Sequence, residues 1–154
     1  MARRTAEAWD RGATEVCMQG GIHPDFTGDT YLRLLAAAKG AAPGVHVHAF
    51  SPLEVQNGAG SLGWGLSRYL AALRDAGLGS LPGTAAEVLD LAVRAVLCPD
   101  KLSSEEWLEV VEAAHGGESL PGLCSSRRGW VWGLSHSLDD NNQREAQHSV
   151  AWLI

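Results

Sequence analysis

The sequence has little of several features that would narrow its function quickly. Only three of its 154 residues are cysteine, and they lie far apart, at Cys17, Cys98 and Cys124. This pattern excludes a dense disulfide framework and fits a reducing compartment. Basic residues number 12 against 18 acidic ones, for a net charge of −6, which argues against a nucleic-acid partner. No apolar run is long enough to span a bilayer, so no membrane partner is expected.

What is present is the composition of an ordinary folded domain. Hydrophobic residues make up 45% of the chain and charged residues 19%. The length fits one domain of common size. Residues 1–10 are polar and helical in character, unlike a signal peptide. We therefore expect a soluble intracellular protein located in the cytoplasm, with an organelle as the open alternative.

Strand-like and helix-like patterns alternate along the first 115 residues. Strands are predicted at 14–18, 45–50 and 78–81, and their starts lie 31 and 33 residues apart. This spacing favours consecutive βα units and therefore an α/β fold with a parallel sheet. Helices are predicted at 29–41, 66–76, 84–97 and 103–115, and a further helix is predicted to start at Ser51.

Two capping signatures mark helix starts. Ser51 is predicted as an N-cap, with Pro52 at the first helical position and Glu54 completing a capping box. Thr84 and Glu87 form a second pair at capping-box spacing, which predicts that the helix over 84–97 begins there. Glu54 and Glu87 also each lie just beyond the C-terminal end of a predicted strand.

A glycine pair follows the first predicted strand, in the run Gln19-Gly20-Gly21-Ile22-His23-Pro24. Without Cβ atoms, two adjacent glycines let a ligand approach the backbone closely. A strand, a glycine pair and then a helix is the layout of a ligand site at the C-terminal ends of parallel strands. The alternative is a tight turn that needs glycine for its geometry alone. His23 either lines the mouth of such a site or is an ordinary loop histidine.

Two histidines share one face of the second predicted strand. Side chains alternate along a strand, so His46 and His48 face one way while Val45, Val47 and Ala49 face the other. The pair is compatible with substrate or cofactor contact, with two polar lining residues, or with metal ligation. The chain supplies no further metal ligands at suitable spacing. Cys17 and Cys98 are predicted to be buried small residues rather than ligands.

The last 39 residues differ from the rest. Glycine, proline and asparagine punctuate residues 116–154, and only Trp130-Val131-Trp132 is compatible with a strand. We expect residues 1–115 to form the folded part and 116–154 a divergent, irregular and poorly ordered tail.

Four motifs resemble one family in order and spacing. They lie at 15–25, 45–55, 79–89 and 98–102, the last followed by Glu106 and Trp107, and the resemblance spans residues 5–115. Together they resemble the tyrosine-using radical S-adenosylmethionine (SAM) subunit of FO synthase, which builds a deazaflavin chromophore. Radical SAM enzymes of the futalosine pathway of menaquinone synthesis share parts of the motifs and are the alternative family. A non-catalytic barrel fragment is the alternative class.

The resemblance implies a partial (βα) barrel of the radical SAM type, with about three βα units. It also implies that the 4-hydroxybenzyl group of L-tyrosine is joined to 5-amino-6-(D-ribitylamino)uracil, with a 4Fe–4S cluster and SAM as cofactors. Two groups of residues follow from it. Those implied in SAM binding are Gln19, Gly20, Gly21 and Glu87. Those implied in substrate binding are His23, His46, His48 and Ser51.

The family's CxxxCxxC cluster loop has no counterpart in this sequence, so we expect the chain to be inactive alone. Cys17, Cys98 and Cys124 lack the close spacing that a 4Fe–4S cluster needs. We predict that anaerobic reconstitution with iron and sulfide leaves the 154-residue chain without a stoichiometric cluster. Iron counting and charge-transfer absorption measure this, and four irons per chain with that absorption would contradict it.

Overall fold

Strands and helices alternate along the first half of the chain. The computed structural model describes residues 1–84, 88–116 and 150–153. None of the helices in these ranges is long and apolar enough to cross a membrane. The elements are α1 (Ala2–Asp10), β1 (Glu15–Met18), α2 (Gly28–Ala41), β2 (His46–Ala49), α3 (Pro52–Ser61), α4 (Leu66–Asp75), α5 (Leu91–Leu97), α6 (Ser104–Gly116) and β3 (Val150–Leu153).

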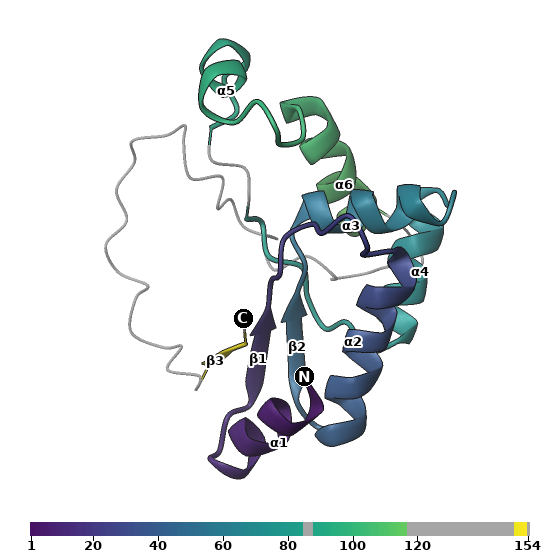
Figure 1. The fold of residues 1–154 in the computed structure, drawn as a ribbon, viewed down its shortest axis with the longest axis vertical. Coiled ribbons are helices and arrows are strands. Elements are labelled where there is room, and N and C mark those ends of the chain that lie inside the picture. Colours follow the sequence, from purple (N-terminus) through teal and green to yellow (C-terminus); the bar gives the residue numbers. More distant parts are fainter. Residues whose placement is uncertain (85–87, 117–149, 154) are drawn as a thin grey trace.

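The three strands form a parallel sheet in the order β2-β1-β3. Glu15 pairs with His46 and Met18 with Ala49, so β1 and β2 are in register along their full lengths. Figure 1 shows α2, α3 and α4 gathered on one side of β1 and β2. The α/β class and the parallel pairing of the first two strands are therefore confirmed.

The two faces of the sheet separate apolar from polar side chains. Val16, Val47 and Ala49 have no exposed surface and belong to the core cluster shared with the helices. Leu35 of α2 and Leu70 of α4 are equally buried in that cluster. Because side chains alternate, Glu15, Cys17, His46 and His48 lie on the opposite face. The period-two pattern of β2 therefore assigned its two faces correctly.

The third predicted strand, 78–81, is reduced to an isolated bridge between His48 and Ser80. It still lies beside β2, since Gly79 N–H donates to the Val47 carbonyl at 2.8 Å and Ala49 N–H to the Ser80 carbonyl at 3.0 Å. Gly77 precedes this segment with φ of +104°, and Pro82 follows it. Glycine weakens strands and proline cannot donate to a ladder, which limits the pairing.

The helix predicted over 84–97 begins later than expected, at Leu91. Asp90 is its N-cap, and its carboxylate accepts from Val93 N–H at 3.0 Å. Thr84 does not cap this helix; its hydroxyl donates to Gln19 Oε1 at 3.4 Å and its carbonyl accepts from Trp107 Nε1. Tertiary contacts thus replaced the local capping signature. Glu87 lies outside the described residues.

The end of the chain contributes a strand that the sequence did not predict. The backbone of β3 pairs with β1 in parallel, with Val150 opposite Glu15 and Leu153 opposite Met18. Figure 1 shows β3 beside β1, on the side away from β2. The prediction of an irregular tail therefore does not hold for residues 150–153. The strand suggested at Trp130–Trp132 lies outside the described residues.

Helices α2, α3 and α4 meet at glycines. A Cβ on Gly58 would lie 2.5 Å from the hydroxyl oxygen of Tyr69, and one on Gly28 would lie 2.7 Å from the Gly58 carbonyl oxygen. The Tyr69 hydroxyl donates to the Gly28 carbonyl at 3.0 Å, and Tyr69 is fully buried. The missing side chains therefore let the three helices approach closely.

This junction gives a matched pair of substitutions on α3. Gly58→Ala forces a methyl group into the Tyr69 ring and should lower the free energy of unfolding by about 1–3 kcal/mol. Gly60→Ala meets no atom within 4 Å and should raise it by about 0.4–1 kcal/mol, because alanine restricts the unfolded chain. Urea titration measures both. Equal effects of the two substitutions would contradict the close packing at Gly58.

Candidate functional site

The loop after β1 is the first part of the site. Gly21 has φ of +67°, which favours glycine, and a Cβ on Gly20 or Gly21 would meet no atom within 4 Å. The glycine pair thus serves the turn geometry at Gly21 and leaves space in front of both residues. The two sequence interpretations of the pair, a tight turn and an open approach for a ligand, are compatible here.

Glu54 ties this loop to the start of α3. Its Oε1 accepts from Gly20 N–H at 2.9 Å, and its Oε2 accepts from Ser51 N–H at 2.7 Å and from the Ser51 hydroxyl at 2.8 Å. The side chain is almost fully buried. The predicted capping box at Ser51 and Glu54 is confirmed. The contact with Gly20, 34 residues away, adds a tertiary role that no local pattern indicates.

The hydrogen-bond donors of Ser51 and Gly20 are therefore already bonded within the protein. Both the N–H and the O–H of Ser51 donate to Glu54, and the serine oxygen accepts from the Glu54 backbone N–H at 3.4 Å. The Gly20 N–H is likewise engaged by Glu54. A ligand at this edge would therefore find the N–H of Gly20 and both donors of Ser51 already engaged by Glu54.

Phe50 joins β2 to this capping box in an uncommon conformation. Its φ is +66°, the left-handed region, in which a non-glycine residue is strained. Its ring is buried and meets the Tyr31 ring edge-on, with centroids 5.0 Å apart. The Tyr31 hydroxyl donates to the Gly21 carbonyl at 3.4 Å, and burial raises the pKa of that phenol.

His23 lies farther out on the same loop. Its ring stacks at a tilt on Phe26, and its Nδ1 accepts from Asp25 N–H at 3.2 Å. The side chain is 58% exposed, so it is placed at the rim of the loop rather than among buried groups. The structure therefore gives His23 the surroundings of a loop histidine, and its contact with substrate stays a prediction.

A second polar cluster lies on the sheet face opposite the helices. Ser80 Oγ is 2.7 Å from His46 Nε2 and 2.7 Å from His48 Nδ1. Glu15 Oε2 is 3.7 Å from the same His46 nitrogen. Burial lowers the pKa of His48, an effect that nearby Glu15 opposes and His46 reinforces. Burial therefore favours the neutral form of His48.

The two histidines occupy different levels of the sheet. His46 pairs with Glu15 at the start of both strands, whereas the glycine loop follows their ends at Met18. Three residues of strand separate these levels, which is about 10 Å. The structure therefore brings His46 to Glu15 and Ser80, and it does not bring His46 to Gly20.

Sequence reasoning missed the roles of Glu15, Ser80 and Thr84. Ser80 and Glu15 both lie inside the motifs of the resemblance, but only their pairing across strands reveals the contacts. Thr84 reaches Gln19, whose amide Nε2 donates to Cys17 Sγ at 3.9 Å. Burial raises the pKa of the Cys17 thiol, while the Gln19 contact lowers it.

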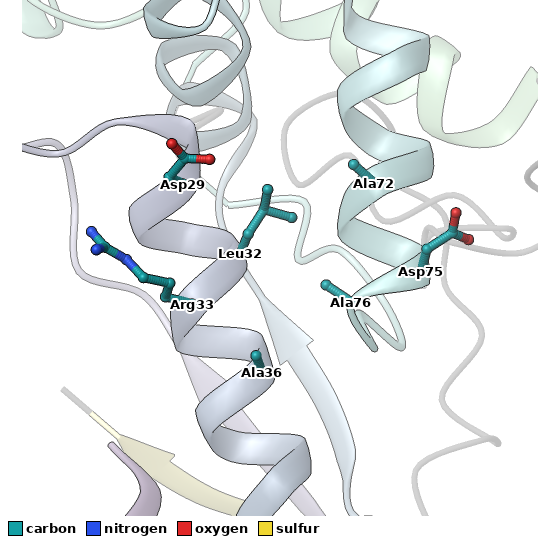
Figure 2. Close-up of a pocket in the computed structure, with 7 residues that line it drawn as sticks. All are labelled: Asp29, Leu32, Arg33, Ala36, Ala72, Asp75 and Ala76. Atoms are coloured by element: carbon teal, nitrogen blue, oxygen red, sulfur yellow. The ribbon is translucent and has the colours of Figure 1, made fainter.

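A separate groove of about 700 Å³ lies on the helical side of the molecule. Figure 2 shows Leu32 and Ala36 of α2 on the side facing Ala72 and Ala76 at the end of α4. Its walls are mainly apolar, with Asp29, Arg33 and Asp75 among its charged residues. None of the predicted site residues lines this groove, so it is distinct from the glycine loop and the histidine cluster.

The described residues do not fit an iron–sulfur cluster. Cys17 and Cys98 are both buried and unpaired, as predicted. Within 1–84, 88–116 and 150–153, no group of three or more His, Cys, Asp or Glu side chains could hold a metal ion. His46 and His48 are therefore not part of such a group within these ranges. Cys124 lies outside the described residues.

Comparison with known proteins connects this geometry to a family. No family model matches the chain. It is 54% identical over 115 residues to FO synthase of Streptomyces avermitilis, a match that covers 75% of this chain and 13% of that protein. This chain is a homologue of FO synthase.

Two further relatives carry the name of a transferase. A 5-amino-6-(D-ribitylamino)uracil–L-tyrosine 4-hydroxyphenyl transferase of Methanothermobacter thermautotrophicus is 46% identical over 134 residues, or 87% of this chain and 36% of that protein. The protein of the same name from a Cyanothece species is 50% identical over 117 residues, with 73% and 31% covered.

The chain thus spans about a third of these transferases and about an eighth of FO synthase. The Methanothermobacter match covers more of this chain than residues 1–115 provide, so it includes part of 116–154. The boundary at residue 115 stays a prediction.

The Glu54 contacts support a testable prediction. Glu54→Gln replaces one accepting oxygen by an NH2 group, so Gly20 N–H or Ser51 N–H loses its partner. We expect a loss of about 1–3 kcal/mol in unfolding free energy. Amide exchange of Gly20 or Ser51, whichever loses its acceptor, should accelerate by about tenfold or more, because the local opening cost falls.

Glu109→Gln, on the exposed side of α6, is the control and should stay within about 0.5 kcal/mol of the parent. Unchanged amide exchange of both Gly20 and Ser51 in Glu54→Gln would show that this carboxylate does not hold the loop.

Proposed function

We propose that this chain forms part of the SAM-binding and substrate-binding walls of a radical SAM transferase. The reaction joins the 4-hydroxybenzyl group of L-tyrosine to 5-amino-6-(D-ribitylamino)uracil. The observation that carries the proposal is the identity of 45–54% to FO synthases and to transferases whose names state these two substrates. The sequence motifs of the resemblance support the same assignment.

The parallel α/β arrangement supports the corresponding fold. We propose that β1, β2 and the segment 78–81 are neighbouring strands of a radical SAM barrel, each followed by its helices. In such a barrel the helices cover the outside, and the opposite sheet face lines the interior. His48 and Ser80 would then face the interior, because Val47 and Ala49 pack against the helices.

The proposed site residues divide between the two levels of the sheet. Gln19, Gly20 and Gly21 would form the wall for the amino-acid end of SAM, with Glu87 as a further candidate. His48 would contact substrate from the sheet face, while His23 and Ser51 would contribute from the strand ends. His46 would act from the lower level. The described residues supply no cluster ligands, so the chain's own contribution is to bind and orient the reactants.

The Methanothermobacter transferase offers a direct test. Residues of this chain replace the matched segment of that protein, the cluster is reconstituted anaerobically, and product is measured by mass spectrometry from L-tyrosine and 5-amino-6-(D-ribitylamino)uracil. We expect the chimera to be active. His48→Ala within the chimera should lower the rate of product formation by about tenfold or more. This is the effect expected from the loss of one neutral hydrogen bond that positions the substrate.

His115→Ala is the matched control, because the His115 ring lies against the Val111 carbonyl of its own helix. It should retain the activity of the chimera. A folded chimera with a full cluster and no product would overturn the proposed function.

A further inference from the structure

The hydroxyl of Ser80 joins two histidines and has only one proton to give. It lies 2.7 Å from His46 Nε2 and 2.7 Å from His48 Nδ1. With one proton and two lone pairs, the hydroxyl can donate to at most one ring, so at least one of the two rings must donate to it. The tautomers of the two histidines are therefore linked through Ser80, because the two rings cannot both accept its one proton.

Glu15 decides the direction of this coupling. Its Oε2 lies 3.7 Å from His46 Nε2, the same nitrogen that meets Ser80. A carboxylate near that nitrogen favours an N–H there and disfavours a lone pair. With an N–H at His46 Nε2 donating to Ser80, the Ser80 proton is free to be donated to His48 Nδ1. The proton of neutral His48 is then on Nε2.

The surroundings fix this arrangement in place. Ser80 is only 8% exposed. A Cβ on Gly79 would lie 2.5 Å from the His46 ring, so glycine at this position lets the ring lie against the backbone. Gly79 N–H and Ser80 N–H both donate to the Val47 carbonyl, which holds Ser80 beside β2. Both histidines and Ser80 are thus held on neighbouring backbone segments.

We propose that Glu15, His46 and Ser80 form a hydrogen-bond relay that locks His48 in its Nε2–H tautomer and presents this N–H to an oxygen acceptor of the substrate. Glu15, His46 and Ser80 are positioning residues that act through His48. Within the described part of the chain, His48 Nε2 has no hydrogen-bond partner, whereas Nδ1 is taken by Ser80. The ligand chemistry that fits is a carbonyl or carboxylate oxygen. The assignment of substrate as its source rests on the proposed function.

The tautomer can be measured without any ligand. Long-range ¹H–¹⁵N spectra of the full 154-residue chain distinguish the two neutral forms of each histidine. We expect His48 to carry its proton on Nε2. Ser80→Ala should give tautomer-averaged nitrogen shifts at His48, and Ser80→Thr, which keeps the hydroxyl, should restore the single form. Ser67→Ala, on the exposed side of α4, should leave it unchanged.

Chemical modification gives a second readout that needs little material. Diethylpyrocarbonate attacks an unprotonated imidazole nitrogen, and the relay occupies that nitrogen of His48. Modification of His48 should accelerate by about fivefold in Ser80→Ala, the equivalent of one net hydrogen bond. His115 serves as the internal reference for unfolding. A proton on His48 Nδ1 in the parent, or an unchanged His48 in Ser80→Ala by both methods, would overturn the relay.

Ligand binding separates this inference from the proposed function. Addition of L-tyrosine or 5-amino-6-(D-ribitylamino)uracil should shift the His48 Nε2 resonance in the parent and less in Ser80→Ala. A locked tautomer with no shift from either compound would refute substrate contact and leave the relay intact. A shift at His48 in a protein that lacks the lock would refute the relay and leave the proposed function standing.

Discussion

The buried carboxylate of Glu54 is the contact on which the edge of the sheet depends. It accepts from Gly20 N–H and from both donors of Ser51, and so links the end of β1 to the start of α3. Hydrogen bonds to charged groups contribute about 1.5–3 kcal/mol each, and a buried acceptor without donors would be costly. The loop and the helix start therefore depend on one side chain, and neither can shift independently.

The two faces of the sheet carry different kinds of side chain. The face of Val16 and Val47 supplies the apolar contacts that hold α2, α3 and α4. The other face carries Glu15, His46 and His48, whose polar atoms meet one another and Ser80. Alternation along two short strands thus places the apolar core on one side of the sheet and the polar cluster on the other. The glycines at helix contacts let the stabilising side close tightly around the strands.

Local patterns predicted the local features. The period-two strand at 45–50 and the capping box at Ser51 were correct because both are determined within a few residues. The helix start near Thr84 was wrong because Thr84 bonds to Gln19 and Trp107, contacts 65 and 23 residues away. The Glu54–Gly20 and Ser80–histidine contacts span 32–34 residues, so only the pairing of strands reveals them. The strand β3 is equally a long-range pairing.

Phe50 shows how the molecule sustains an unfavourable backbone conformation. A left-handed non-glycine residue costs about 1–3 kcal/mol. Burial of a phenylalanine ring contributes a similar amount, and its edge-on contact with Tyr31 adds to it. The aromatic packing therefore supplies the energy that keeps the turn between β2 and α3 sharp. Glycine at position 50 would remove the backbone strain but would also remove the buried ring. The strained turn and the packing of the aromatic cluster therefore depend on the same residue.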